Sequence, residues 1–275
     1  MKRIIYILLT VLFSCEEVIT IDLPSAQNLV VIEGWVTDSL STHPVRITRS
    51  SAFSSMDDIV LIEDAQLIVQ ASTGEVFPYS YSNNGYYEAD IAFRGAPGNQ
   101  YRLLAIVDTV EIRSEWDSMP ERVDILSLEI ESFEENDPNN PNQQLTVYYP
   151  KINAIDPADR KNQYRWIFYK NDTQFTEPEP ITIQNDRLFN GNLIPNNFQA
   201  FGYDSGEKIT LQLQSISSSA HNYLSLLKSQ ITTLGTSSGT TPAIVEGNLS
   251  YTDDDRMVLG FFGSASSSID SVFVE

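Results

Sequence analysis

The sequence is poor in the residues on which most metal centres and thiol enzymes depend. Its 275 residues include one cysteine, Cys15, and two histidines, His43 and His221. A single cysteine cannot form an internal disulfide, and three such residues cannot supply the ligand clusters of zinc proteins. The sequence therefore predicts no disulfide framework, no metal centre and no cofactor.

Positive charge is also scarce. Only 17 Lys and Arg residues stand against 37 Asp and Glu residues, a formal net charge of -20. Such a surface repels phosphate backbones, which excludes nucleic acid as a partner. Apolar residues make up 41% of the chain, enough for a substantial core. The length fits two domains or one large β domain.

Long apolar runs are missing except near the start. Lys2 and Arg3 precede the apolar run Ile4 to Phe13, which ends at Cys15. As a helix this run would rise ~15 Å, about half of the hydrocarbon core of a membrane. This pattern is typical of a signal peptide. We therefore expect residues 1–14 to be a signal peptide and residues 15–27 to be a modified N-terminus and tether.

The end of this run resembles the lipobox of bacterial lipoproteins, in the residues Leu12-Phe13-Ser14-Cys15. The resemblance implies cleavage before Cys15 and acylation of that residue, and several acyl chains make a stable membrane anchor. The alternatives are an ordinary signal peptide with a chance cysteine and a buried cysteine in a cytosolic protein. Glu16 and Glu17 resemble the surface-export signal of Bacteroidota lipoproteins, which implies an outer-membrane lipoprotein facing the cell exterior. A periplasmic orientation stays open.

The first part of the body, residues 28–115, has the pattern of a β-sandwich. Short runs rich in β-branched and aromatic residues follow one another closely, and several alternate apolar and polar side chains. Asn84-Gly85 favours a two-residue hairpin, because both central positions of a type I′ turn need a positive φ. Asp108-Thr109 is a further turn candidate. About seven strands in this space predict an immunoglobulin-like or transthyretin-like sandwich.

The second part follows a predicted linker at residues 116–122. Residues 123–275 are predicted to form a larger β-barrel or β-sandwich, with Glu134 to Gln143 as a polar loop. Apolar residues recur at helical spacing between residues 217 and 234, after serines suited to capping. The fold class is therefore mainly β, with two domains and one packed helix in the second.

Several short motifs, in order, resemble an uncharacterised family of Bacteroidota outer-membrane lipoproteins. They begin at Cys15 to Pro24 and Val30 to Asp38 and end at Val258 to Gly263. Between these lie Gly85-Tyr-Tyr, Phe93 to Gly98, Tyr101, Tyr164-Arg-Trp166 and the segment Tyr223 to Lys228. The resemblance implies an outer-membrane location and, in many cases, a gene beside that of a TonB-dependent receptor. It implies no enzyme activity.

Two patterns of catalytic serine occur, and neither has the expected context. Gly235-Thr-Ser-Ser-Gly239 matches the nucleophile elbow, but a predicted helix precedes it where a strand is needed. Ser225 and Lys228 match the S-x-x-K pattern without its partner motifs. The acidic runs Glu134 to Asp137 and Asp253 to Asp255 lack the spacing of an EF-hand calcium loop. We therefore predict that the protein is not an enzyme.

Aromatic residues gather around the predicted hairpin at Asn84-Gly85. Tyr79, Tyr81, Tyr86 and Tyr87 are candidate binding residues, since exposed tyrosines bury large areas at little entropic cost. The alternative is that they fill the core of a sandwich.

Four short matches resemble the O-glycosylation acceptor of Bacteroidota, in which Asp precedes Ser or Thr and an apolar residue follows. The candidate acceptors are Ser39, Thr109, Ser118 and Ser271.

These observations lead to two hypotheses. In the first, the protein is a non-enzymatic accessory subunit of a transport or assembly complex, anchored in the outer membrane at Cys15 and bound to a TonB-dependent receptor-type β-barrel. In the second, it is a free-standing lipoprotein that binds a glycan or a peptide.

Overall fold

The computed structural model describes residues 28–50, 59–137, 140–175, 181–196, 198–199, 201–234, 244–253 and 255–275. The chain is mainly β, as the sequence predicts, and α2 (Ser218–Leu234) is the α-helix within the described residues. The strands are β1 (Val30–Thr37), β2 (Val45–Arg49), β3 (Val60–Leu61), β4 (Gln66–Ala71), β5 (Val76–Asn83), β6 (Tyr86–Ala89), β7 (Gln100–Val107), β8 (Val110–Ser114), β9 (Asp117–Ser118), β10 (Ile125–Asp137), β11 (Asn140–Ala154), β12 (Gln163–Lys170), β13 (Thr173–Phe175), β14 (Thr182–Asn185), β15 (Lys208–Ile216), β16 (Glu246–Tyr251) and β17 (Met257–Phe273).

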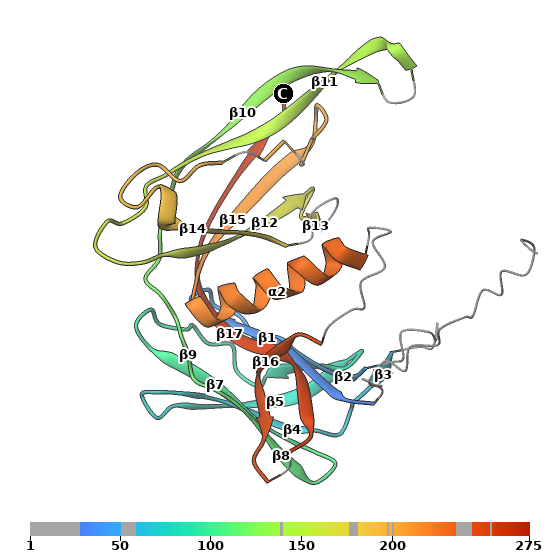
Figure 1. Ribbon diagram of the computed structural model, residues 1–275, viewed down its shortest axis with the longest axis vertical. Coiled ribbons are helices and arrows are strands. Elements are labelled where there is room, and N and C mark those ends of the chain that lie inside the picture. The colour runs from blue at the N-terminus through green and yellow to red at the C-terminus, as the bar shows by residue number, and fades with distance from the viewer. Residues whose placement is uncertain are drawn as a thin grey trace, which may run out of the picture.

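The lower lobe in Figure 1 is a ring of strands paired in the order β1-β2-β6-β5-β4-β7-β8-β16-β17, and β17 closes the ring on β1. Alternating burial along these strands directs one side chain of every two into a shared apolar core that includes Ile32, Val69 and Leu103. The turn at Asn84-Gly85 has positive φ at both residues, as predicted. The finer prediction of an immunoglobulin- or transthyretin-like layout stays a prediction.

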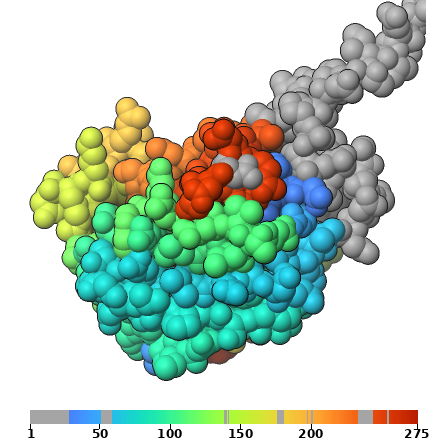
Figure 2. Space-filling view, turned by 90° about the horizontal axis from the view of Figure 1, so that it is seen from below, coloured from blue at the N-terminus to red at the C-terminus, as the bar shows by residue number. Residues whose placement is uncertain are grey.

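The last strands of the chain complete the first lobe. β16 pairs with β8, and the first half of β17 runs parallel to β1, so Leu249, Val258 and Phe262 belong to the lower core. Figure 2 shows this C-terminal segment, in red, seated beside N-terminal residues in blue and green. The sequence prediction assigns residues 123–275 to a second domain by themselves. The structure differs, because the apolar side chains of β16 and β17 are needed to fill the first core.

The upper lobe is built on the second half of β17. This half pairs with β15, β15 pairs with β12, and β12 pairs with β13 and β14. One face of this sheet packs on an aromatic-rich core that includes Trp166, Phe168 and Phe201, with ring centroids 3.9 Å apart for Phe168 and Phe201. Helix α2 covers the other face where the two lobes meet, through Ala220 and Leu224 (Figure 1). Within the described residues, no helix is both long and apolar enough to cross a membrane.

β10 and β11 form a separate two-stranded hairpin, which projects from the top of the upper lobe (Figure 1). Its base packs on the upper core through Leu128, Ile130 and Ile152. The segment predicted as a polar loop from Glu134 to Gln143 differs in the structure, since β10 continues to Asp137 and β11 begins at Asn140. The backbone N–H and C=O groups of β10 and β11 hydrogen-bond to each other, so this segment forms strands although its side chains are polar.

Candidate functional site

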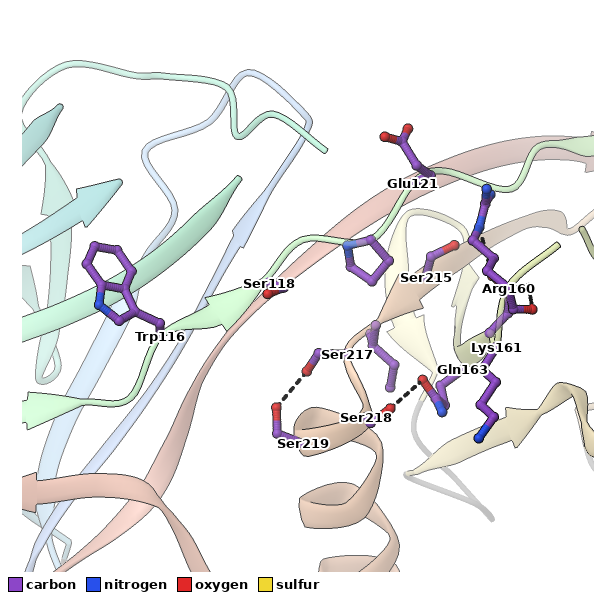
Figure 3. Close-up of a pocket in the computed structure, with 13 residues that line it drawn as sticks. Trp116, Ser118, Glu121, Arg160, Lys161, Gln163, Ser215, Ser217, Ser218 and Ser219 are labelled. Atoms are coloured by element: carbon purple, nitrogen blue, oxygen red, sulfur yellow. Dashed lines mark hydrogen bonds between the residues drawn. The ribbon is translucent and has the colours of Figure 1, made fainter. Parts of the chain in front are cut away.

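A cavity of about 380 Å³ lies where the two lobes meet, at the N-terminal end of α2 (Figure 3). Three segments far apart in the sequence form it: the segment after β8, the loop before β12, and the passage from β15 into α2. Its lining is rich in hydroxyl and amide groups, and its charged groups are Glu121, Arg160 and Lys161. The size is within the range of small-molecule sites.

A buried carboxylate fixes one wall of this cavity. Asp117 is 1% exposed. Its carboxylate accepts hydrogen bonds from the Ser217 hydroxyl at 2.5 Å, the Ser219 hydroxyl at 2.9 Å and the Ser264 amide at 2.7 Å. Ser217 in turn caps α2, since its hydroxyl accepts a bond from the Ala220 amide at 3.1 Å. Asp117 therefore joins the lower lobe, the start of the helix and the shared strand β17.

Burial raises the pKa of the Asp117 carboxyl, although the hydrogen bonds from Ser217, Ser264 and Ser219 act in the opposite direction. The predicted linker at residues 116–122 is thus held firmly at its start. Met119 is also buried, and it exchanges backbone bonds with Asn99 and Gly98. These contacts fix the first part of the segment to the lower lobe.

The opposite wall carries two adjacent cations, Arg160 and Lys161. Asn162, which follows them, is 5% exposed and holds their loop in place. Its amide donates to Asp186 at 2.6 Å, and its side chain donates to the carbonyls of Pro157 and Arg160. Arg160 donates to Asn162 at 3.2 Å and forms an ion pair with Asp159 at 3.7 Å, whereas the exposed Lys161 makes no ion pair within the described part of the chain.

The floor of the cavity includes a hydroxyl without a partner. Ser215 is 2% exposed, and its Oγ makes no hydrogen bond within the described residues. Ser218 donates to Gln163 at 3.2 Å across the cavity, and Figure 3 shows these side chains converging while Trp116 points away. The Trp116 ring instead stacks under the guanidinium of Arg102, 4.5 Å from its centroid. Ser217, Ser218 and Ser219 already donate their hydroxyl protons within the protein, so Lys161 and Ser215 are donors of the lining that a polar ligand would meet.

The four tyrosines predicted as a binding cluster divide between core and surface. Tyr79 and Tyr87 are buried, and the Tyr87 hydroxyl donates to the Ile62 carbonyl at 3.0 Å. Tyr81 and Tyr86 are exposed by 37% and 39%. Tyr81 donates to Glu63 at 2.8 Å and packs edge-on against Tyr87, whereas Tyr86 lies under Arg46. The structure does not bring these four side chains into the junction cavity.

The four candidate glycosylation sites lie in different places. Thr109, Ser118 and Ser271 are exposed, and Ser39 is half-buried. Thr109 occupies the turn between β7 and β8, Ser271 lies on the second half of β17, and Ser118 lines the junction cavity. O-glycosylation of these four residues stays a prediction.

Several predicted features lie outside the described residues. These include Cys15, Glu16 and Glu17 and the pattern Gly235 to Gly239. The two histidines are described: His43 is buried, with its ring 3.0 Å from the Phe93 carbonyl, and burial lowers the pKa of both His43 and His221. Among the described residues, no group of three or more His, Cys, Asp and Glu side chains is placed to hold a metal ion.

The junction residues were not predicted as a site from the sequence. One signal was present: Arg160-Lys161 is the only adjacent pair of basic residues after Lys2-Arg3 in a strongly acidic chain. The run Ser217 to Ser219 was interpreted only as a helix cap. The convergence of these segments depends on the pairing of β15 with β12 and β17, which the sequence does not specify.

Fold and site together define a class: a mainly β protein of two lobes that share one long strand, with a polar cavity open to solvent at their junction. The family model described as "Domain of unknown function (DUF4249)" matches residues 16–270, and the chain belongs to this family. The prediction that the chain belongs to an uncharacterised family is therefore confirmed. The comparison with curated proteins gives no match, and neither does the comparison with solved structures.

Proposed function

We propose that the protein is a lipid-anchored, non-enzymatic accessory subunit of an outer-membrane complex, and that it binds a TonB-dependent receptor-type β-barrel. The anchor is Cys15, and the acidic pair Glu16 and Glu17 directs the body to the cell exterior. This part of the proposal rests on the sequence pattern alone.

The observation that carries the partner-binding role is the projecting hairpin. We define the arm as the distal part of this hairpin, Glu131–Asp137 with Asn140–Val147. Its side chains are largely exposed, yet Phe133 and Leu145 are apolar and remain 40% and 39% exposed. Glu135 pairs with Leu145, and residues two apart on a strand share a face, so Phe133 and Leu145 lie on one face of the arm.

The arm is ordered by cross-strand contacts, two of which come from Tyr149 and Lys151 in the base of the hairpin. Tyr149 donates to Glu135 at 2.5 Å, Thr146 donates to Glu134 at 2.8 Å, and Lys151 forms an ion pair with Glu131 at 2.5 Å. An isolated two-stranded hairpin is marginal in water, so these contacts and the packed base are needed to hold it. An ordered arm with an apolar face offers a partner a surface that loses little entropy on binding.

The arm is also acidic. Glu131, Glu134, Glu135 and Asp137 lie on it, whereas Lys151, the basic residue of the two strands, lies in the base. We therefore propose that the partner presents a basic face to the arm and that salt weakens the association.

The test is affinity purification of the tagged full-length protein from its own outer membranes in mild detergent, followed by mass spectrometry. We expect a stoichiometric β-barrel partner. Phe133→Ser combined with Leu145→Ser should remove it, because both changes delete the apolar face of the arm. Leu188→Ser is the matched control, since Leu188 is 97% exposed and lies in the short 3-10 helix η2 (Asp186–Leu188), outside the arm.

A wild-type protein that purifies alone would contradict the proposal and favour a free-standing binding protein. Retention of the partner by the double variant would show that the arm is not the binding surface.

A further inference from the structure

The junction cavity has the features of a ligand site, independently of the partner-binding arm. The N-terminus of α2 alone is a weak indication of a ligand, because the Asp117 carboxylate already accepts hydrogen bonds from the hydroxyls of Ser217 and Ser219 there. The second observation is Ser215. Its hydroxyl is 98% buried, lines the cavity on the side of Arg160 and has no hydrogen-bond partner within the described residues (Figure 3). Seven buried side-chain polar atoms of the described residues lack a partner, and of these residues only Ser215 lines the cavity. Because buried polar groups are normally paired, its hydroxyl is available to a ligand there.

The charges of the cavity indicate the sign of the ligand. Arg160 and Lys161 face it from a loop that Asn162 holds in place. Glu121 is the acidic group of its lining, and Asp159 beside the lining pairs with Arg160 at 3.7 Å. In a chain with a net charge of -20, two adjacent cations on one cavity wall are unusual. The start of α2 lies on the other wall, beside the Asp117 carboxylate, so the positive charge comes from Arg160 and Lys161. The wall that carries Arg160 and Lys161 therefore suits an oxyanion.

The other polar groups of the lining indicate that the rest of the ligand carries hydroxyl groups. Hydroxyls of Ser118 and Ser218, the amide of Gln163 and the carboxylate of Glu121 can exchange hydrogen bonds with several hydroxyl groups. The volume of about 380 Å³ admits a molecule of one or two sugar rings.

We propose that the cavity binds a small saccharide that carries an oxyanion group, either a sugar acid or a sugar phosphate. The oxyanion lies against Arg160 and Lys161, the Ser215 hydroxyl donates to it, and the sugar hydroxyls bond to Gln163 and Glu121.

The test is isothermal titration calorimetry of the purified full-length protein in mild detergent with four probes: glucuronate, glucose 6-phosphate, glucose and inorganic phosphate. We expect at least one anionic sugar to bind, with glucose weaker by about tenfold or more, the usual effect of losing a charged hydrogen bond. The tighter of the two anionic sugars identifies the oxyanion as a carboxylate or a phosphate.

Variants locate the site. Lys161→Ala should weaken binding about tenfold. Arg113→Ala removes the same charge from the exposed face of β8 and should have no effect. Ser215→Ala should lower the affinity while the melting temperature stays constant or rises, because it removes a buried hydroxyl that the fold leaves unpaired.

Three results would overturn the proposal. The first is no heat of binding for either anionic sugar up to about 10 mM, well above the expected Kd. The second is unchanged affinity in both Lys161→Ala and Ser215→Ala. The third is inorganic phosphate that binds as tightly as glucose 6-phosphate, which would mean a simple anion site without saccharide recognition.

Discussion

At the scale of single residues, Gly260 shows how closely β17 approaches β1. Its φ is +96°, and a Cβ placed there would lie 2.0 Å from the Ile32 carbonyl oxygen of β1. No side chain fits such a contact. The parallel pairing of β17 with β1, and with it the closure of the lower ring, therefore requires glycine at this position.

Gly260→Ala should lower the free energy of unfolding by at least about 2 kcal/mol, since both the backbone strain and the contact with β1 must be relieved. Gly74→Ala is a matched control, because Gly74 also has a φ of +96° but nothing lies within 4 Å of its Cβ position. We expect a cost of about 1 kcal/mol there. Chemical denaturation measures both, and equal costs would mean that the close approach to Ile32 is unimportant.

Asp117 is the residue on which the junction between the lobes depends most. Asp117→Ala would leave the Ser264 amide without its acceptor and should cost about 1–3 kcal/mol of stability. Asp117→Asn keeps the shape and one acceptor oxygen, so it should cost less. A cost for Asn as large as that for Ala would show that the negative charge itself is required.

The same residue predicts a pH dependence. Because burial raises the pKa of Asp117, the folded state binds its proton more tightly than the unfolded state, in which the ordinary value is 3.8. The contribution of this proton to stability is fully present below 3.8 and is lost as the pH rises through the raised pKa. Urea unfolding should therefore show wild type losing stability relative to Asp117→Asn over this window. A constant difference would contradict the raised pKa.

At the scale of elements, the hairpin between β7 and β8 carries a local strain. Its two turn residues, Asp108 and Thr109, both have positive φ, at 50° and 70°. Asp and Gly are the residues that favour such a turn, and a β-branched threonine is unfavourable there. The ion pair of Asp108 with Arg49 helps to hold the turn.

Thr109→Gly should raise the free energy of unfolding by about 1 kcal/mol, because glycine adopts the left-handed conformation without a steric penalty. Thr109→Ala removes the same hydroxyl and β-branch but keeps a Cβ. Thermal unfolding of the two variants separates the causes: an equal gain for alanine would mean that the backbone conformation is not the source of the strain.

Element prediction from this sequence succeeds where local physics decides. β7 alternates apolar and polar residues, so its sequence predicts the strand that is observed at Gln100–Val107. The helix was predicted within one residue of α2, from its apolar spacing and its serines. Both signals belong to single segments, so they need no knowledge of the rest of the fold.

Prediction fails where pairing partners decide. The sequence of β17 predicts two strands, Met257–Phe262 and Ile269–Val274, with only small side chains between them from Gly263 to Ser268. In the structure β17 is one strand of 17 residues, because those small residues pack where both lobes and α2 meet. β16 was missed because Glu246-Gly-Asn-Leu-Ser-Tyr251 has little β propensity, and pairing with β8 and β17 imposes the strand.

At the scale of the whole molecule, the two lobes are not formed by two successive segments of the chain. β17 contributes its first half to the lower ring and its second half to the upper sheet, and α2 packs over the crossing. The junction cavity and Asp117 lie at this crossing, whereas the arm projects from the far end of the upper lobe (Figure 1). The surface proposed for the ligand and the surface proposed for the partner are therefore separate.

The most direct test of the central claim is the mass of the complex formed by a chain whose arm is shortened. Replacing Phe133–Val147 by Asn-Gly joins Ser132 to Tyr148, which are paired in the structure, through a favoured two-residue turn. The base of the hairpin and its bond between Tyr148 and Tyr203 remain. We predict that native mass spectrometry of detergent-extracted outer membranes finds the wild-type protein with a β-barrel partner and the folded, shortened protein alone. The same complex mass for both would contradict the account.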